Sequence, residues 1–505
     1  MKKAKTIMIQ GTASAVGKSI IVTALCHIFM QDGHKVAPFK AQNIALNSFV
    51  TAGGGEIGRA QAVQAEAAGI APTVDMNPVL LKPTANSGCQ VIVLGKVDRS
   101  ISAQDYTNYA PALLPIVTEA LERLRAEYDI VVIEGAGSTA EINLKDREIV
   151  NMRIAKAAGS PVLLVGDIDK GGVFASLVGT LELLDKKEQH YVKGMIINKF
   201  RGDIALLKPA IDFVEKKTGL PMLGIIPYFK DIRIAQEDSV YLDERKAGIS
   251  SGGLNIGVIR LPHISNYDDF DPLEEDGCTV SYINKPFELV NPHLIILPGT
   301  KSTINDLQYL HQSGLADVIL EKAKAGIPVV GICGGYQMLG KKILDPQRVE
   351  SEKTEVAGLG LLDVVTEFAA EKSTTQVKAK TVSQKGLLAG TKGMEINGYE
   401  IHMGQTRSEE KSNAFKVIET PQGRTDYLDG ALDATGMILG TYMHGLFHND
   451  SFRQVFLNNL RRRWGLVENS TGVGTEKDRQ YDKLAELVRQ NIDMARIYRI
   501  IEAGI

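Results

Sequence analysis

Short apolar runs rich in valine and isoleucine recur along the chain, and each ends in polar or glycine-rich residues. Longer segments with apolar residues at helical spacing separate them, and this alternation is typical of parallel α/β units. We expect strands at residues 6–9, 130–133, 162–165 and 195–197, and in a second series at residues 254–259, 294–297, 327–333 and 437–442. The pattern predicts an α/β protein of two three-layer domains, with ligands at the carboxyl ends of the strands.

A stretch of small residues at 246–253 divides the two series and is typical of a linker. The chain has 505 residues, whereas single hydrophobic cores stop growing at about 250–300 residues. We expect an N-terminal domain at 1–245, a C-terminal domain at 254–455 and a helical extension at 456–505. The stretch 359–392, rich in Thr, Val and Lys, is interpreted as strands or a loop excursion without assigned chemistry.

Composition argues against several classes of protein. With 23% charged residues and a formal net charge of -3, the chain lacks the basic character of a general nucleic-acid-binding protein. Its four cysteines include no C-x-x-C pair, which argues against a zinc site or a disulfide framework and fits a reducing cytoplasm. The sequence contains no apolar run of about 18 residues, so we expect no membrane partner. The oligomeric state stays open.

A glycine loop follows the first apolar run, with the sequence Gly11-Thr-Ala-Ser-Ala-Val-Gly17-Lys18-Ser19. Five residues separate its glycines, one more than in the common P-loop pattern. Backbone N–H groups of Gly11, Thr12 and Gly17 can surround phosphates. Lys18 can neutralise the phosphate charge, and the Ser19 hydroxyl can bind Mg²⁺. The loop therefore predicts a site for ATP and Mg²⁺.

Polar residues follow the other predicted strands of the first series. Glu134 comes directly after the run 130–133, which is the place for a second Mg²⁺ contact. Asp167 and Asp169 occupy a comparable strand end, and spacing alone does not decide which carboxylate holds the metal. Asn198 resembles the strand-end asparagine that contacts adenine in related P-loop proteins.

Two polar stretches near the N-terminus, together with one nearby lysine, supply candidate substrate groups. The stretch 39–48 contains Lys40, Gln42 and Asn43, and the stretch 56–64 contains Arg59. Lys82 lies in Pro-Val-Leu-Leu-Lys-Pro-Thr. Amides, ammonium groups and a guanidinium suit a carboxylate-rich substrate. The second stretch also has helical spacing, so Arg59 could instead belong to a solvated helix face.

A cysteine lies at a predicted strand-to-helix turn in Gly-Ile-Cys333-Gly-Gly-Tyr-Gln. A free thiol has a pKa of about 8.5, and a helix N-terminus favours the thiolate. His444, at another strand end, can act as its base. Gly299 and Gly334 are the candidate oxyanion-binding positions, because glycine lets the backbone approach a substrate closely. The pattern predicts attack by a thiolate on a carbonyl group.

The segment around Cys333, together with His444, resembles the class I glutamine amidotransferases. The resemblance implies that L-glutamine is hydrolysed through a cysteine thioester with release of ammonia. Most such domains carry a glutamate two positions after the histidine, and this chain has Leu446 there. The departure matches the branch that amidates cobyrinate, and it leaves the third member of the catalytic set unidentified.

The N-terminal half resembles the dethiobiotin-synthetase-like P-loop family, which shares the five-residue spacing and the Glu-Gly-Ala-Gly strand end. Within that group, the stretches 40–51, 56–66 and 76–84 resemble corrinoid amide synthetases. The resemblance covers nearly the whole chain. It implies ATP- and glutamine-dependent amidation of the b, d, e and g carboxylates of adenosylcobyrinic acid a,c-diamide to give adenosylcobyric acid, through an acyl phosphate that ammonia attacks.

Two alternatives stay open at this point. The synthase that forms cobyrinic acid a,c-diamide shares both domains, and we expect its N-terminal substrate loops to differ from the stretch 40–51. A switch ATPase similar to ParA and MinD belongs to another class. Such proteins place a signature lysine just after the first loop glycine, where this chain has Thr12, and they need no reactive thiol.

Overall fold

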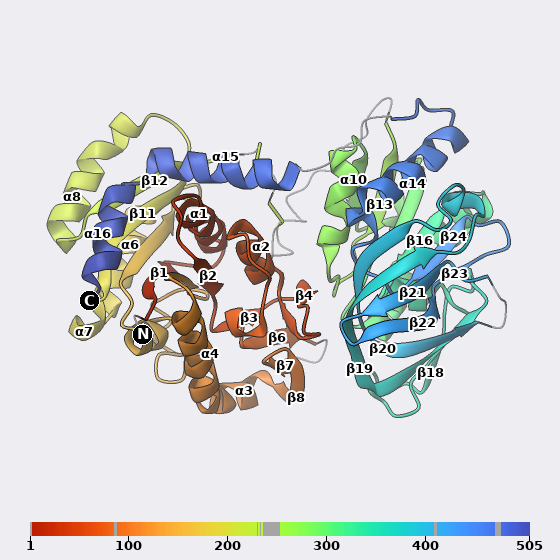
Figure 1. Cartoon of the computed structure of the whole chain (residues 1–505), viewed down its shortest axis with the longest axis horizontal. Helices are drawn as coiled ribbons and strands as arrows, with labels where there is room; N and C mark the ends of the chain where they lie inside the picture. The colour runs from red at the N-terminus through yellow and green to blue at the C-terminus, as the bar shows by residue number, and fades with distance from the viewer. Residues whose placement is uncertain are drawn as a thin grey trace.

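The computed structural model describes residues 3–84, 88–229, 231–232, 234–235, 253–408, 412–469 and 476–505. Apart from Gly253, the expected linker at 246–253 lies outside the described residues. Figure 1 shows two halves side by side, and each contains a six-stranded sheet with helices, in agreement with the predicted α/β class. Among the described residues, no helix has the length and apolar character needed to cross a membrane.

The N-terminal half is built on a six-stranded sheet in which every pair is parallel. Its order is β12 (Met222–Pro227), β11 (Val192–Phe200), β10 (Val162–Asp167), β1 (Lys5–Gly11), β9 (Ile130–Glu134) and β2 (Val36–Phe39). Alternate residues of β1 enter different cores, since Ile7 and Ile9 pack on one face and Met8 packs on the other. Burial on both faces explains why these strands are continuous apolar runs.

Helices cover both faces of this sheet, which gives the three-layer arrangement. They are α1 (Lys18–Gln31), α2 (Arg59–Ala67), α3 (Ala103–Tyr109), α4 (Leu114–Glu127), α5 (Met152–Ala158), α6 (Val173–Leu183), α7 (Lys186–Gln189) and α8 (Lys208–Thr218). A second sheet has the order β3 (Gln42–Ile44), β6 (Val79–Pro83), β7 (Gly88–Val93) and β8 (Lys96–Ser102). A short hairpin, β4 (Ser48–Val50) with β5 (Glu56–Gly58), precedes α2 directly.

The C-terminal half contains a second six-stranded sheet. Its order is β14 (Thr279–Ile283), β13 (Asn255–Ile259), β15 (Leu294–Leu297), β16 (Val329–Ile332), β24 (Ile438–Thr441) and β23 (Ala431–Leu432), with only the last pair antiparallel. Its helices are α10 (Asp271–Glu275), α11 (Thr303–Gln312), α12 (Leu315–Lys324), α13 (Gly334–Leu339) and α14 (Asp450–Arg463). The four strands predicted in this half are confirmed as β13, β15, β16 and β24, and their first and last residues lie close to the predicted ones.

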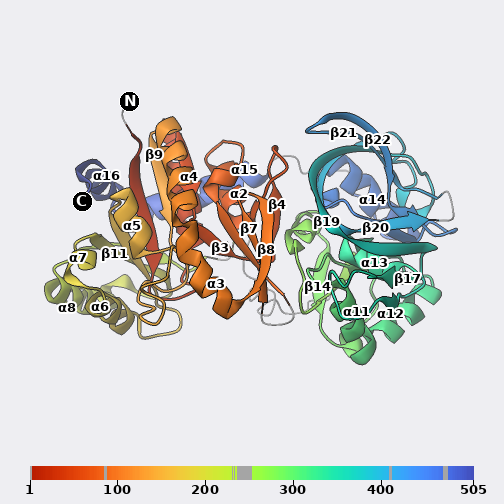
Figure 2. The ribbon, with the colours of Figure 1, turned by 90° about the horizontal axis from the view of Figure 1, so that it is seen from below.

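The stretch 359–392 contributes to a further sheet. That sheet comprises β17 (Lys342–Leu344), β18 (Glu355–Ala357), β19 (Val364–Thr381), β20 (Glu395–Ser408), β21 (Phe415–Thr420) and β22 (Gly423–Asp429). The long pair β19–β20 packs against the β4–β5 hairpin of the N-terminal half (Figure 2). Val50 joins Tyr399 and Ile401 in one apolar cluster, and the Gln376 side-chain amide donates to the Val50 carbonyl at 2.8 Å. The stretch thus forms part of the junction between the halves.

The end of the chain is organised differently from the expectation. The expected boundary at residue 455 falls inside α14, whose Phe452 and Phe456 belong to the C-terminal core. The last two helices, α15 (Glu476–Asn491) and α16 (Met494–Ala503), instead pack on the N-terminal half. α15 lies along α1 and β12 (Figure 1). They complete the layer over one face of the first sheet, so this half contains both ends of the chain.

Candidate functional site: a thiol centre and a phosphate-type loop

The thiol centre begins at the turn between β16 and α13. Cys333 has φ 52° and ψ -108°, an uncommon backbone conformation for a residue other than glycine. The turn packs closely against β15 and requires glycine at position 335, because a Cβ atom on Gly335 would lie 2.0 Å from the Leu297 carbonyl oxygen. The turn presents the sulfur at the start of a helix, in the arrangement of a nucleophile elbow.

His444 lies just after β24 and meets Cys333, as the sequence predicts. The Cys333 side chain raises the His444 pKa, and the Cys333 thiol donates to the Ile401 carbonyl oxygen at 3.2 Å. Cys333 is 7% exposed and His444 is 2% exposed, so the pair is shielded from bulk water. The Tyr399 ring stacks on the His444 ring, with 5.3 Å between centroids.

The two predicted oxyanion glycines flank this pair. A Cβ atom on Gly299 would lie 2.8 Å from the His444 ring, and one on Gly334 would lie 3.2 Å from the Thr300 backbone nitrogen. The loop after β15 and the first turn of α13 therefore approach each other closely at the sulfur. A side chain at Gly299 would therefore collide with the His444 ring, and one at Gly334 with Thr300 in the loop after β15.

Asp269 completes the set that sequence reasoning left incomplete. Its Oδ2 accepts a hydrogen bond from His444 Nδ1 at 2.7 Å, and its Oδ1 accepts from the Gly445 backbone N–H at 2.8 Å. Burial alone would lower the His444 pKa, but the Asp269 carboxylate and the Cys333 side chain raise it to about 10. Leu446, at the position of the usual glutamate, is fully buried in the core. The available signal was the acidic pair Asp268-Asp269 in Tyr-Asp-Asp-Phe, between the first two predicted strands of the C-terminal half.

The second site lies at the carboxyl edge of the N-terminal sheet. The glycine loop joins β1 to α1, and Gly17 has φ 97°, the left-handed region that favours glycine. The Lys18 ammonium group donates to the Ala13 and Gly137 carbonyl oxygens, at 3.0 and 2.8 Å. The Thr12 backbone N–H donates to the Val165 carbonyl oxygen at 2.9 Å, so that amide already serves the neighbouring strand.

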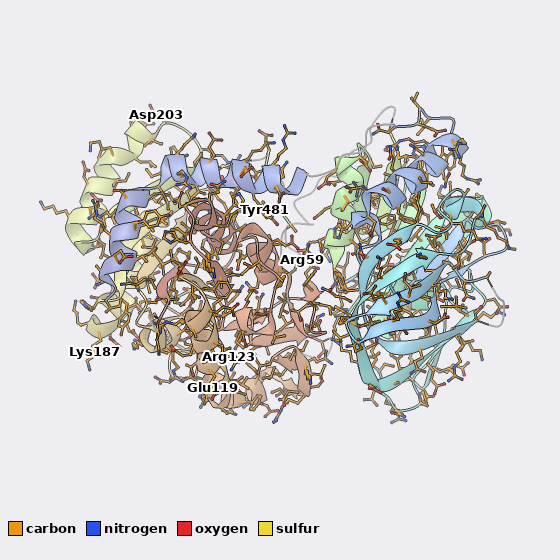
Figure 3. All side chains as sticks on the ribbon, in the orientation of Figure 1. Arg59, Glu119, Arg123, Lys187, Asp203 and Tyr481 are labelled. Atoms are coloured by element: carbon orange, nitrogen blue, oxygen red, sulfur yellow. The ribbon has the colours of Figure 1, made fainter. Side chains whose placement is uncertain are left out.

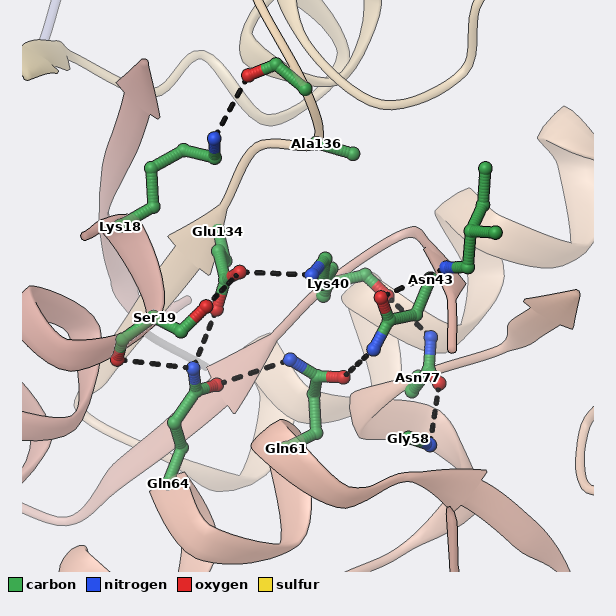
Figure 4. A network of polar contacts seen from close by, with 12 residues as sticks. Lys18, Ser19, Lys40, Asn43, Gly58, Gln61, Gln64, Asn77, Glu134 and Ala136 are labelled. Atoms are coloured by element: carbon green, nitrogen blue, oxygen red, sulfur yellow. Dashed lines mark hydrogen bonds and ion pairs between the residues drawn. The ribbon is translucent and has the colours of Figure 1, made fainter. Parts of the chain in front are cut away.

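Glu134 is the centre of a polar network at this edge (Figure 4). Its Oε1 accepts from the Ser19 hydroxyl at 2.8 Å and lies 2.9 Å from the Lys40 ammonium nitrogen. The Gln64 amide donates to Oε2 at 2.5 Å. Burial alone would raise the Glu134 pKa, but the charge of Lys40 outweighs it and holds the pKa below its ordinary value. Glu134 is therefore a carboxylate here, beside the Ser19 hydroxyl.

The competing strand-end carboxylates are engaged elsewhere. Asp167 pairs with Lys199 at 2.8 Å, and Asp169 pairs with Arg201 at 2.8 Å. Among the described residues, the hydroxyl of Ser19 donates to Glu134 and to neither of these two carboxylates. Asn198 supports the glycine loop, because its amide nitrogen donates to the Val16 carbonyl oxygen at 2.9 Å. Its Oδ1 atom is buried and, within the described part of the chain, has no hydrogen-bond partner.

Three predicted substrate residues lie in the segment between β2 and the β4–β5 hairpin. Lys40 contacts Glu134 as described, and the Asn43 amide donates to Gln61 Oε1 at 3.0 Å. Gln42 accepts a hydrogen bond from the Tyr106 hydroxyl. Gln42 and Asn43 lie on β3 of the second sheet, and Lys40 lies between β2 and β3.

The other two predicted substrate residues are placed differently. Arg59 and Lys82 are 4% and 3% exposed, and both face carboxylates of the protein. Arg59 Nε lies 3.1 Å from an oxygen of Asp268, which belongs to the C-terminal half. Lys82 pairs with Glu56, which also pairs with Lys372 of β19. Both charges are thus paired with carboxylates within the junction, and direct contact of these two residues with a substrate stays a prediction. Lys372 is a junction residue that sequence reasoning missed.

Family models match both halves of the chain. Residues 255–452 match a CobB/CobQ-like glutamine amidotransferase domain, and residues 5–236 match an AAA domain. The two matches cover the thiol centre and the glycine loop respectively. They agree with the α/β architecture of each half.

Curated relatives resemble the chain over its full length. One from Dehalococcoides mccartyi is 62% identical over 502 residues, with 99% of each chain covered. Another from Pelotomaculum thermopropionicum is 50% identical and covers 99% of this chain and 97% of its own. A third from Sorangium cellulosum is 51% identical, with 99% of each covered. All three are named cobyric acid synthase. At such identity over nearly every residue, the chain belongs to the family of cobyric acid synthases.

Proposed function

We propose that the chain amidates the b, d, e and g carboxylates of adenosylcobyrinic acid a,c-diamide, using ATP and glutamine, to give adenosylcobyric acid. The coarser assignment, a glutamine-dependent amide ligase of cobalamin biosynthesis, follows from the family. The observation that carries the proposal is that one chain holds both a Cys–His–Asp set and a glycine loop with Lys18, Ser19 and Glu134. One centre releases ammonia, and the other activates the carboxylate that receives it.

At the thiol centre, Asp269 fixes the His444 tautomer so that Nε2 faces the sulfur. The Cys333 thiolate attacks the side-chain carbonyl of glutamine, and a carbon–sulfur bond forms. His444 gives its proton to the departing ammonia, and water then hydrolyses the thioester to glutamate. The close approach of Gly299 and Gly334 supports a role in holding the oxyanion of each tetrahedral intermediate.

At the glycine loop, a carboxylate oxygen of the corrinoid attacks the γ-phosphorus of ATP, and ADP leaves. Ammonia attacks the acyl carbon of the resulting mixed anhydride, phosphate leaves, and an amide forms. Lys18, held by two carbonyl oxygens, is positioned to move onto phosphate oxygens. The buried Oδ1 of Asn198 is suited to accept a hydrogen bond from the adenine amino group. Lys40, Gln42 and Asn43 are the proposed contacts for the substrate carboxylate.

The residues at this edge fit Mg²⁺. The Ser19 hydroxyl and the Glu134 carboxylate are hard oxygen donors 2.8 Å apart. Mg²⁺ is commonly held by one or two such protein groups together with substrate phosphates. When bound, it would neutralise phosphate charge during transfer.

Use of ATP and four free thiols support a cytoplasmic location.

The proposal is tested by following the corrinoid mass with glutamine or ammonia as nitrogen donor, in the wild type and in Cys333→Ala. Successive amide additions to the a,c-diamide are expected, with the variant active only on ammonia. Amidation of cobyrinic acid but not of its a,c-diamide would instead assign the earlier synthase step. ATP hydrolysis without any change in corrinoid mass would contradict both assignments.

A further inference from the structure

The turn that carries Asp269 is held by the N-terminal half of the chain. Asn266 donates from its side-chain amide to the Ser48 carbonyl at 3.1 Å, and the Tyr267 backbone N–H donates to Asn47 Oδ1 at 3.2 Å. The next residue, Asp268, lies 3.1 Å from Arg59 Nε. Three consecutive residues before the histidine-orienting carboxylate are thus fixed by another domain. The position of His444 therefore depends on the junction.

Arg59 is the charged member of this contact and has an unusual environment. Figure 3 places it where the two halves meet. Its guanidinium lies over the Phe49 ring, 5.4 Å from the centroid, and 3.8 Å from Glu66. Burial alone would lower the Arg59 pKa, but the carboxylate of Asp268 raises it above its ordinary range. Arg59 is therefore a permanent buried cation whose charge is matched across the junction.

The same helix also reaches the polar network at Glu134, through residues in its middle. Arg59 is the first residue of α2, and Gln64 in its middle donates to Glu134 at 2.5 Å. Gln61 on this helix bonds both Gln64 and Asn43. Arg59 and Gln64 belong to one nine-residue helix, so a displacement of the helix at Gln64 would also displace Arg59. A change in the ligands of Glu134 alters the partner that holds Gln64.

We propose that Arg59 is a positioning residue of the glutaminase centre, and that α2 transmits the state of the Glu134 site to the turn that orients His444. The inference rests on the proposed function. When ligands bind at Glu134, its hydrogen bond with Gln64 changes, and α2 shifts as a result. Through the Arg59–Asp268 pair, this adjustment moves Asp269 relative to His444. Glutamine hydrolysis is then fast only when the synthetase site is loaded.

The test compares Arg59→Met, Asp268→Asn and the double variant, with Arg123→Met as the matched control. Arg123 forms a surface pair with Asp75 in the same half, so its loss removes an arginine without touching the junction. Glutamate release is measured with and without ATP, and amide formation is measured with ammonia as donor. Thermal unfolding is recorded for every variant.

For Arg59→Met we expect kcat for glutamate release without ATP to fall by about tenfold or more, with KM for glutamine changed by less than about twofold, because a misplaced base slows chemistry and not binding. Ammonia-dependent amidation and its corrinoid KM should stay near wild type. The double variant also removes the buried carboxylate that Arg59→Met deprives of its arginine, so it should regain stability while its kcat stays low. Gln64→Met should keep glutaminase activity but lose its response to ATP.

Several outcomes would overturn the inference. A raised corrinoid KM with ammonia would make Arg59 a substrate contact. Recovery of wild-type kcat in the double variant, or an equal fall of every activity with the melting temperature, would leave Arg59 a structural role only. An unchanged ATP response in Gln64→Met would remove α2 as the link. Because glutamate release needs no corrinoid, failure of the proposed function appears separately, as a wild type that never changes the corrinoid mass.

Discussion

Asp269 and His444 lie 175 positions apart in the chain, and their side chains meet at 2.7 Å between Oδ2 and Nδ1. Both residues are almost completely buried. A buried carboxylate that accepts from Nδ1 fixes one tautomer of the imidazole and stabilises its protonated form. In this chain the carboxylate that contacts the histidine comes from an early turn of the C-terminal half, and the position two residues after the histidine is Leu446.

The first prediction concerns the replacement Asp269→Asn. The amide keeps the shape of the side chain but cannot stabilise the imidazolium, so we expect kcat for glutamate release to fall by about 10²-fold or more. Amide formation from ammonia should continue, because the glycine loop is unchanged. Parallel assays with glutamine and with ammonia measure the difference. Full glutaminase activity in this variant would show that Asp269 has no part in the reaction.

The second prediction concerns pH. The His444 pKa is raised from 6.5 to about 10, so His444 binds its proton more tightly in the native state than in the unfolded state. This stabilisation is complete below pH 6.5 and is lost as the pH rises through about 10. We expect the alkaline limb of the glutaminase rate near that upper value. In Asp269→Asn the limb should move to lower pH, and a limb that stays in place would contradict the assignment.

The strands and the two reactive turns were predictable because their signals are local. β9 is buried at every position, so it appears in the sequence as an unbroken apolar run. The loop before Lys18 and the turn at Cys333 need glycine at fixed spacing for steric reasons, and this need is visible without a structure. The α/β class and the Cys333–His444 pair both follow from such local signals.

The remaining features depend on partners far away in the chain. Arg59 and Lys82 carry charges that suit an anionic substrate, yet their carboxylates come from Asp268 in the other domain and from Glu56 in a neighbouring hairpin. No periodicity indicates such pairing, and a buried charge looks like an exposed one in sequence. The docking of α15 on the opposite domain is hidden for the same reason, since helical spacing shows an apolar face but not what covers it.

The third prediction separates the candidate metal ligands. Glu134→Gln should lower ammonia-dependent ATP turnover by about 10²-fold and raise the Mg²⁺ concentration needed for half-maximal rate, since the anionic oxygen beside Ser19 is lost. Asp167→Asn is the matched control and should lower turnover by no more than about fivefold. Steady-state rates across a Mg²⁺ titration distinguish the two. A larger effect at Asp167 would reverse the assignment.

The fourth prediction concerns the junction lysines. Glu56 is 1% exposed and pairs with both Lys82 and Lys372. Glu56→Gln leaves two buried ammonium groups without their anion, and we expect a loss of about 3–5 kcal/mol in the free energy of unfolding. Glu122→Gln, which loses surface pairs with Lys3 and Arg125, should change it by less than about 1 kcal/mol. Urea unfolding measures both variants.

The same pair of variants tests the pH dependence of the junction. Burial alone would raise the Glu56 pKa, but Lys372 and Lys82 hold it well below the ordinary 4.5. A carboxylate with a lowered pKa stabilises the native state above its ordinary pKa, and this contribution is lost as the pH falls toward the lowered value. Wild-type stability should therefore decline in acid more steeply than that of Glu56→Gln. Parallel declines would exclude Glu56 as the source.

The last prediction concerns the returning C-terminal helices. Leu484 of α15 is fully buried in the core that α1 and the first sheet share. Leu484→Ala leaves a cavity there, and we expect a loss of about 2–5 kcal/mol in stability. Val467→Ala, at a residue 91% exposed, is the control and should change stability by less than about 0.5 kcal/mol. Hydrogen exchange should quicken in α1 and β12 of the Leu484 variant while the C-terminal sheet keeps its protection. Faster exchange in the C-terminal sheet instead would mean that α15 stabilises the C-terminal half and not the N-terminal half on which it packs.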